Sequence, residues 1–317
     1  DAHYIKDRAP DLNFIELAIN DSIDFLNGNR VYDMDENNVY IETIVRKIYV
    51  SNPSADIVFV LTGNYERLKS EAEGGETFGE KYINIGNYYD IPVVRCGTAM
   101  AEFLSEKNGG TFPGKENNQY PQLWFDYYKD NVHPADMGHY IYAKTVRSFL
   151  SEWMTGNFKP TGVTDKALPE KTYCETNGYG KLMMDACMVS PGQLKGTDGL
   201  GGFKVVSNDN ALMPYSLISE TDGDEIVLTF HAKSIAIWTL APKPSDQTKI
   251  LCSVDGGAET ELEIVYNSGS RNNKVFLLAD GLSDGTHTIR IRHTGEKILD
   301  IRYFLLYGIS ESESLLN

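Results

Sequence analysis

The sequence predicts two domains of different class, an α/β domain followed by an all-β sandwich or jelly roll. The chain has 317 residues, which is more than a single domain usually contains. Before residue 157, apolar runs typical of buried strands alternate with the spacing of amphipathic helices, which favours a parallel sheet between helices. After residue 170, short strand-like runs are separated by Asp-Gly turns, which favours antiparallel sheets.

The α/β domain is expected at residues 1–157. Its strand candidates are short apolar runs, and its helix candidates repeat apolar residues at intervals of three and four. The expected elements are a strand at 12–19, a helix around 41–49, a strand at 56–62, a helix around 78–89, a strand at 91–96 and a long helix at 135–154.

A linker is expected at residues 158–169, where Pro160, Gly162 and Pro169 stand among polar residues. The sandwich is then expected at 170–310 and a frayed tail at 311–317. The clearest strand candidates of the sandwich are residues 225–231, 234–240, 249–254, 274–279, 286–292 and 298–307.

The charge balance excludes two classes of partner. The chain has 45 Asp and Glu against 29 Lys and Arg, a formal net charge of −16. An acidic chain is a poor match for a nucleic-acid backbone or an anionic membrane surface. No apolar run approaches the ~20 residues that a membrane-spanning helix needs. The sequence therefore predicts neither a nucleic-acid nor a membrane partner.

The four cysteines leave two readings open. No CxxC pair is present, so the sequence indicates neither a zinc ribbon nor a thioredoxin-type motif. Cys174 and Cys187 would be able to pair, and four unpaired buried thiols fit the sequence equally well. The chain begins at Asp1 without a signal peptide, and we expect a mature or trimmed chain.

The first chemical motif is Asp130-Asn131-Val132-His133-Pro134, directly before the long helix. A carboxylate three residues before a histidine can bond one ring nitrogen and stabilise the imidazolium that forms when the other nitrogen takes a proton. Pro134 favours an extended backbone at His133. The alternative is a plain helix start with a surface histidine and a solvated carboxylate.

The second motif is Asn20-Asp21, at the end of the first expected strand. Ligands of open α/β sheets bind beyond the carboxyl ends of the strands. The Asn20 amide would donate there to a developing oxyanion, an interaction that can lower a barrier by ~3 kcal/mol. The alternative is that both residues only shape a turn.

Together, in this order, the two motifs resemble the SGNH (GDSL-type) hydrolase family. The segment PDLNFIELAINDS is similar to that family's third block, although Ala18 replaces the usual glycine, and DNVHPADMGHYIYAKTV is similar to its fifth block. The resemblance covers roughly residues 8–154. It implies a flavodoxin-like three-layer fold and ester hydrolysis by a serine nucleophile, without a metal ion or an organic cofactor.

The resemblance assigns a role to each motif residue. Asp130 would orient the general base His133, Asn20 would donate to the oxyanion, and Asp21 would support its loop. The family's serine block should precede the third block by many tens of residues, and neither a GDS nor a GxSxG sequence occurs. We therefore expect a fragment, with a serine block on another chain or a natural pseudoenzyme as alternatives, and we expect this chain to be inactive. A three-stranded remnant would also leave a sheet edge that pairs with a missing N-terminal segment or another chain.

Residues 170–308 resemble the β-sandwich modules found beside SGNH domains in secreted carbohydrate esterases. The similarity lies in SVDGG, GLSDGTHTIRIRH and ILDIRYFLLYG. It implies an acylated carbohydrate as the substrate and an extracellular or periplasmic location. Four aromatic residues would be able to stack on sugar rings, or would be ordinary core and surface residues: Tyr173, Tyr179, Tyr215 and Trp238. The rival hypothesis is a non-catalytic glycan-binding or cell-surface protein on a degenerate SGNH fold.

Overall fold

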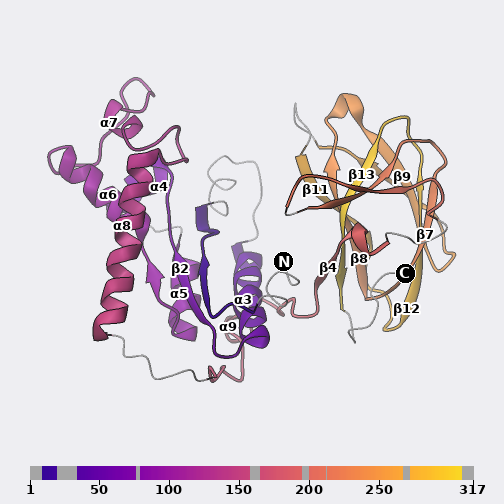
Figure 1. The fold of residues 1–317 in the computed structure, drawn as a ribbon, viewed down its shortest axis with the longest axis horizontal. Coiled ribbons are helices and arrows are strands. Elements are labelled where there is room, and N and C mark those ends of the chain that lie inside the picture. The colour runs from indigo at the N-terminus through magenta and orange to yellow at the C-terminus, as the bar shows by residue number, and fades with distance from the viewer. Residues whose placement is uncertain are drawn as a thin grey trace. The chain divides into compact units, whose positions relative to one another are not determined.

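The computed structural model describes residues 9–19, 34–75, 79–157, 165–194, 200–211, 213–266 and 272–308. These residues form two compact units that meet in the sequence between Leu182 and Met183 (Figure 1). The first unit has α/β structure and the second is built from β-strands, as the sequence predicts. Each unit is described by itself.

The α/β unit is built on a parallel sheet of β1 (Leu12–Ile15), β2 (Asp56–Val60) and β3 (Val93–Val94), in that order. The three strands begin within or at the expected runs, but all of them are shorter than the predicted 12–19, 56–62 and 91–96. Ala18 and Ile19, which we expected to continue the strand, adopt helical backbone conformation. The side chain of Glu16 explains this local turn, because its Oε1 accepts a hydrogen bond from the Ile19 N–H at 3.4 Å.

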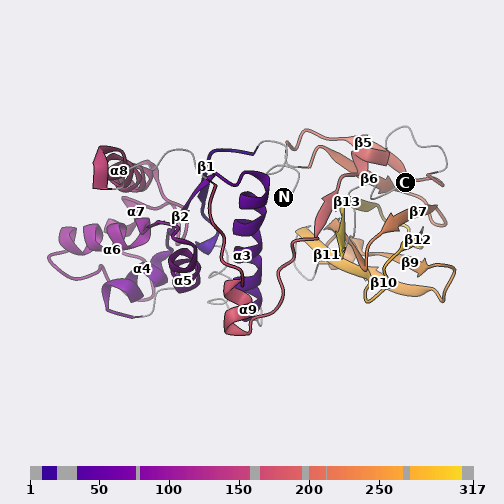
Figure 2. The same cartoon turned by 90° about the horizontal axis from the view of Figure 1, so that it is seen from below.

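Helices cover both faces of this sheet (Figure 2). On one face, α3 and α5 pack with Ile57 and Phe59 of β2. On the other face, α8 packs with Val58 and Val94. The helices of the unit are α3 (Met34–Ser51), α4 (Tyr65–Ala72), α5 (Glu80–Tyr89), α6 (Cys96–Lys107), α7 (Gln122–Phe125), α8 (Asp136–Glu152) with its π-helical extension η1 (Trp153–Asn157), and α9 (Tyr173–Asn177).

The segment that contains α9 belongs to the α/β unit, whereas the sequence assigned it to the sandwich. The carboxylate of Glu42 on α3 is fully buried and accepts hydrogen bonds from the N–H groups of Tyr173 at 2.6 Å and Cys174 at 2.8 Å. Arg46, one turn further along, donates to the Pro169 carbonyl at 2.8 Å. The α/β unit therefore ends at Leu182 and not at the predicted residue 169. Tyr173 and Tyr179 accordingly belong to the α/β unit and not to the sandwich. Residues 158–164 of the predicted linker and the tail 311–317 lie outside the described residues.

The second unit consists of two antiparallel sheets. One has the order β10-β9-β12-β7, and the other has the order β11-β8-β13-β6-β5 with β4 beside β13. Its elements are β4 (Cys187–Val189), η2 (Pro191–Leu194), β5 (Lys204–Ser207), β6 (Tyr215–Ser219), β7 (Glu225–His231), β8 (Ser234–Ala241), η3 (Pro244–Asp246), β9 (Thr248–Val254), β10 (Thr260–Ile264), β11 (Asn272–Ala279), β12 (Thr286–His293) and β13 (Leu299–Tyr307).

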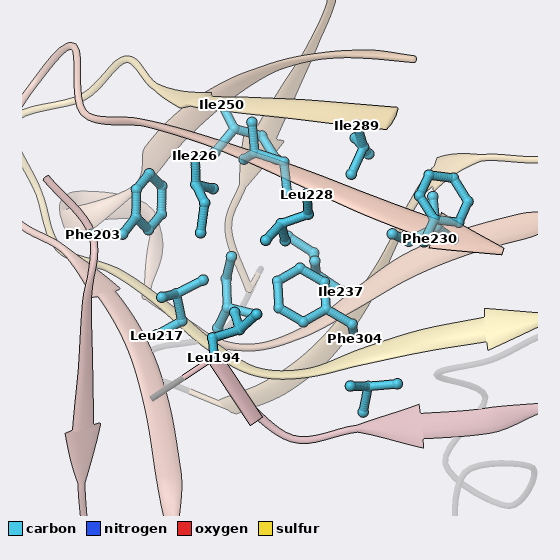
Figure 3. Packing of buried hydrophobic residues seen from close by; sticks show 14 of the residues in the cluster. Leu194, Phe203, Leu217, Ile226, Leu228, Phe230, Ile237, Ile250, Ile289 and Phe304 are labelled. Carbon is cyan, nitrogen blue, oxygen red and sulfur yellow. The ribbon is translucent and has the colours of Figure 1, made fainter. Parts of the chain in front are cut away.

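Alternate residues of the strands fill one core between the two sheets (Figure 3). Along β7, Ile226, Leu228 and Phe230 point inward and are at most 2% exposed. Along β8, the Trp238 side chain points away from this core, because its neighbours Ile237 and Thr239 are the buried residues. The centroid of the Trp238 ring lies 5.8 Å from that of the Tyr303 ring. All four cysteines are free thiols.

A predicted Asp-Gly turn follows β9 and anchors a histidine. Asp255 and Gly256 both have positive φ, 52° and 71°, as the turn type expected for this dipeptide requires. The Asp255 carboxylate lies 2.7 Å from Nδ1 of His287, and Nε2 of that ring donates to the Ser283 carbonyl at 3.0 Å. Both ring nitrogens thus face acceptors, and the hydrogen bond to Asp255 raises the pKa of His287.

We expect this contact to make stability depend on pH. The pKa of His287 is raised above the ordinary value of about 6.5 that it has in the unfolded chain. Its contribution is therefore fully present below about pH 6.5 and is lost as the pH rises through the higher folded-state pKa. Thermal unfolding of the wild type and of His287→Gln between pH 5 and 9 measures this. The two curves should converge toward high pH, and parallel curves would contradict the assignment.

Candidate active site

Asp130 and His133 lie together in the loop that precedes α8. The His133 ring donates from Nδ1 to Oδ2 of Asp130 at 2.7 Å. The other carboxylate oxygen, Oδ1, accepts the backbone N–H groups of Val132 and His133, both at 2.7 Å. The backbone hydrogen bond from His133, with the ring hydrogen bond second, lowers the pKa of Asp130 to about 2. The carboxylate is therefore ionised at any physiological pH and holds the ring in one tautomer.

This tautomer leaves Nε2 of His133 as a proton acceptor. The His133 side chain is 74% exposed, so the second nitrogen is accessible to a reactant. No hydroxyl or thiol of the described residues is hydrogen-bonded to it. The geometry is that of the base and orienting acid of a hydrolase triad, and the catalytic role itself remains a prediction.

Aromatic side chains hold the Asp130–His133 loop in position. Trp124 of α7 donates from Nε1 to the Asp130 carbonyl at 2.7 Å, and its ring stacks on Tyr128 with centroids 3.8 Å apart. The Tyr65 N–H donates to the Asn131 carbonyl at 3.0 Å. The two sequence motifs do not predict the role of these residues. The sequence feature that points to them is the aromatic-rich run WFDYY, residues 124–128, just before Asp130. A loop that is only solvated has no need for so many aromatic residues.

The loop lies at the carboxyl edge of the parallel sheet. The Tyr65 N–H that holds it begins α4, directly after β2. Tyr128 donates to the carbonyl of Gly63 in the same connection at 3.3 Å. Thr62 of this connection donates to the Glu16 carboxylate just beyond β1 at 2.9 Å. The ends of β1 and β2 and the Asp130–His133 loop are thus joined at the edge where open α/β sheets bind ligands.

The remaining predicted site residues are not placed. Asn20 and Asp21, the expected oxyanion donor and its support, lie outside the described residues. The described part of the chain contains no group of three or more His, Cys, Asp or Glu side chains that would hold a metal ion. It also contains no helix with the length and apolarity required to cross a membrane.

We expect Trp124 to act as a positioning residue for the loop. Trp124→Phe removes the hydrogen bond to the Asp130 carbonyl and keeps an aromatic ring against Tyr128, so stability should fall by about 1 kcal/mol. A looser loop weakens the N–H bonds to the carboxylate, so the pKa of Asp130 should rise from about 2 toward its ordinary value. Carboxyl-carbon NMR titration measures this pKa. Trp153→Phe, at the start of η1 directly after α8, is the matched control and should leave it unchanged.

Comparison with known proteins defines the class of fold. No protein-family model matches the chain, and no curated protein matches it. Two crystal structures of a two-domain esterase active on acetylated mannans are similar in structure, one of them co-crystallised with mannopentaose. The mannopentaose structure has a TM-score of 0.61, with 97% of this chain aligned to 74% of that chain. The other has a TM-score of 0.64, with 98% aligned to 78%, and both are 15% identical in sequence. The chain therefore shares the fold of a two-domain esterase.

Proposed function

We propose that this protein is a serine esterase of the SGNH type that removes acyl groups, acetyl above all, from carbohydrates. The observation that carries the proposal is the Asp130–His133 pair at the carboxyl edge of the sheet, in a fold shared with an esterase active on acetylated mannans. Such substrates lie outside the cell or in the periplasm, so we propose the same location for the protein.

The geometry of the dyad supports a separate role in ester hydrolysis for each candidate residue. Nε2 of His133 accepts the proton of a serine hydroxyl while that oxygen attacks the ester carbonyl, and Asp130 stabilises the imidazolium. The imidazolium then returns the proton to the sugar oxygen that leaves. We assign the amide of Asn20 to the oxyanion, and Asp21 to the support of its loop. Water, activated by His133, releases the acyl group from the serine.

No serine is among the described residues that are hydrogen-bonded to His133. We therefore propose that residues 1–317 alone do not hydrolyse the ester substrate. Acetate release from acetylated mannan and p-nitrophenyl acetate hydrolysis should equal those of His133→Ala. Turnover that depends on His133 would show that a serine of this chain serves as the nucleophile. It would overturn the proposed inactivity while supporting the esterase.

The function itself is tested by ligand binding at the dyad. Acetylated manno-oligosaccharides should shift the ring NMR signals of His133, and the same oligosaccharides after deacetylation should not. The Asp130→Asn variant, which misorients the ring, should reduce the shift. If only signals of residues 183–308 respond, and respond equally to both ligands, the chain is a glycan-binding protein rather than an esterase.

A further inference from the structure

Tyr142 is a residue of α8 that neither sequence motif uses as a functional residue, and its hydroxyl has a buried partner. The Tyr142 ring packs in both hydrophobic clusters beside α8, so a phenylalanine would fill the same space. The hydroxyl, however, lies 2.6 Å from the hydroxyl of Tyr128, which is 1% exposed. Buried hydroxyls are hydrogen-bonded in stable folds. Because Tyr128 stands two residues before Asp130, Tyr142 is bonded to the segment that leads into the dyad loop.

The two hydroxyls form a closed set of hydrogen bonds with the backbone of Gly63. Tyr128 donates its single hydrogen to the Gly63 carbonyl at 3.3 Å, so the hydrogen between the two rings comes from Tyr142. The Tyr142 oxygen in turn accepts a hydrogen bond from the Gly63 backbone. Burial raises the pKa of Tyr142 to about 12 and also raises that of Tyr128, so both hydroxyls stay protonated at physiological pH. Hydrogen bonds in such a set strengthen one another.

Gly63 belongs to the connection between β2 and α4, residues 61–64, and this connection holds the carboxyl end of β1. Thr62 donates to the carboxylate of Glu16 at 2.9 Å. The same carboxylate oxygen accepts the Ile19 N–H at 3.4 Å, one residue before the proposed oxyanion donor Asn20. Through Glu16, the position of Thr62 therefore influences the backbone that leads to Asn20.

The same connection also holds the dyad loop. Directly after it, the Tyr65 N–H donates to the Asn131 carbonyl, in the middle of the loop, at 3.0 Å. Gly63 packs closely on α4, because a Cβ there would lie 2.1 Å from Cδ1 of Leu68. Since Thr62, Gly63 and Tyr65 are near neighbours in the chain, a displacement of Gly63 disturbs the contacts of the other two.

We propose that Tyr142 is a positioning residue, whose hydroxyl holds Gly63 so that His133 and the backbone before Asn20 keep one relative geometry. The hydroxyl touches no reacting atom and acts through the connection after β2. Its importance for catalysis rests on the proposed function, because ester hydrolysis requires the proton acceptor and the oxyanion donor at fixed places around one carbonyl group.

Tyr142→Phe tests this role, because it removes the hydroxyl and keeps the ring. Hydrogen exchange of the Tyr65 N–H should accelerate about tenfold, as the loss of one hydrogen bond that limits local opening allows. The NMR signals of the His133 ring and of the Ile19 N–H should both shift, although Gly63 separates them from Tyr142 in the hydrogen-bond set.

Tyr88→Phe is the matched control. It also removes a tyrosine hydroxyl of the α/β unit that donates to a backbone carbonyl, that of Lys171 at 3.0 Å. This bond joins α5 to the segment before α9 and does not involve the connection after β2. Tyr88→Phe should therefore leave the exchange of Tyr65 and the signals of His133 and Ile19 unchanged.

A double variant shows whether the two hydroxyls act as one set. Tyr128→Phe should cause the same changes as Tyr142→Phe, and the combined variant should accelerate exchange by less than the product of the two single effects. The positioning role is refuted if the two effects multiply. It is also refuted if Tyr142→Phe shifts the signals of His133 and Ile19 no more than Tyr88→Phe does.

The link to catalysis has its own readout. The shift that acetylated manno-oligosaccharides cause in the His133 ring signals should be smaller in Tyr142→Phe and unchanged in Tyr88→Phe. An equal shift in Tyr142→Phe would show that the hydroxyl does not serve the ligand site. A wild type without any such shift contradicts the proposed function, and leaves the positioning role to be decided by the spectra measured without ligand.

Discussion

Replacing Glu42 by alanine should destabilise the α/β unit by about 3 kcal/mol and release the segment around α9. Removing one member of a buried, hydrogen-bonded charged group costs this much because its partners remain buried without acceptors. Three donors lose their acceptor in this variant. They are the N–H groups of Tyr173 and Cys174, at 2.6 and 2.8 Å, and the hydroxyl of Tyr89. Chemical denaturation measures the loss of free energy, and limited proteolysis within residues 169–182 measures the release.

Two further variants separate the hydrogen bonds from the bulk of the side chain. Glu42→Gln keeps the shape and one acceptor oxygen, so its cost should be smaller than that of alanine. Glu106→Ala removes an exposed carboxylate of α6 and should change stability by less than about 0.5 kcal/mol. If Glu42→Ala cost no more than Glu106→Ala, or if residues 169–182 stayed protected, then Glu42 would not be what holds this segment to α3.

The Glu42 contacts also explain why the sequence predicts one domain boundary in the wrong place. Glu42 lies 131 residues before Tyr173, so no local pattern marks their contact. Pro160, Gly162 and Pro169 gave a strong local signal for a linker, and the chain after them was assigned to the sandwich for that reason. The tertiary contact overrides the local composition, and the compact unit continues to Leu182.

Elements with strong periodicity were predicted well, and those without it were missed. The run EIVLTFH forms β7 with the predicted bounds, 225–231, and buried residues alternate along it, although the apolar Val227 faces outward. Half of the residues of the short helix α4 are charged, and its start depends on Asn64, whose side chain accepts the Arg67 N–H at 3.0 Å. Helix α6 begins at Cys96, inside a run that was interpreted wholly as a strand.

The candidate site was predictable where its contacts are local. Asp130 and His133 are three residues apart, so their spacing alone gives the hydrogen bond that the structure contains. Trp124 is only six residues from Asp130, but its role depends on how α7 turns its ring under the loop, which spacing does not reveal. The contact from Tyr65 to Asn131 joins segments 66 residues apart and requires the folded sheet. Asn20 and Asp21 stay predictions.

Replacing Gly138 by alanine should displace the Asp130–His133 loop and destabilise the unit by about 1–3 kcal/mol. Alanine normally stabilises a helix interior relative to glycine by about 0.5–1 kcal/mol, so the expected sign is the reverse of the usual one. The reason is a close approach between α8 and the loop. A Cβ at Gly138 would lie 2.2 Å from the Tyr127 carbonyl oxygen and 2.9 Å from Cβ of Pro134.

The backbone at Tyr127 and Pro134 cannot shift away from a Cβ at residue 138 without disturbing the Asp130–His133 pair. The Tyr127 carbonyl accepts the Ala135 N–H at 2.8 Å, and the Lys129 N–H donates to the His133 carbonyl at 2.8 Å. Pushing Tyr127 or Pro134 away therefore strains the two bonds that set the position of His133 before the helix. We expect the pKa of Asp130, which those positions hold near 2, to rise together with the loss of stability.

Ser148→Ala provides the control for helix propensity, because Ser148 is exposed on the same helix and alanine there meets no neighbour. It should raise the melting temperature slightly, while Gly138→Ala lowers it by several degrees. Carboxyl-carbon NMR of Asp130 in both variants supplies the second readout. A stabilised Gly138→Ala with an unchanged Asp130 titration would show that the close approach of α8 does not fix the loop, and that the contacts from Trp124 and Tyr65 hold the dyad.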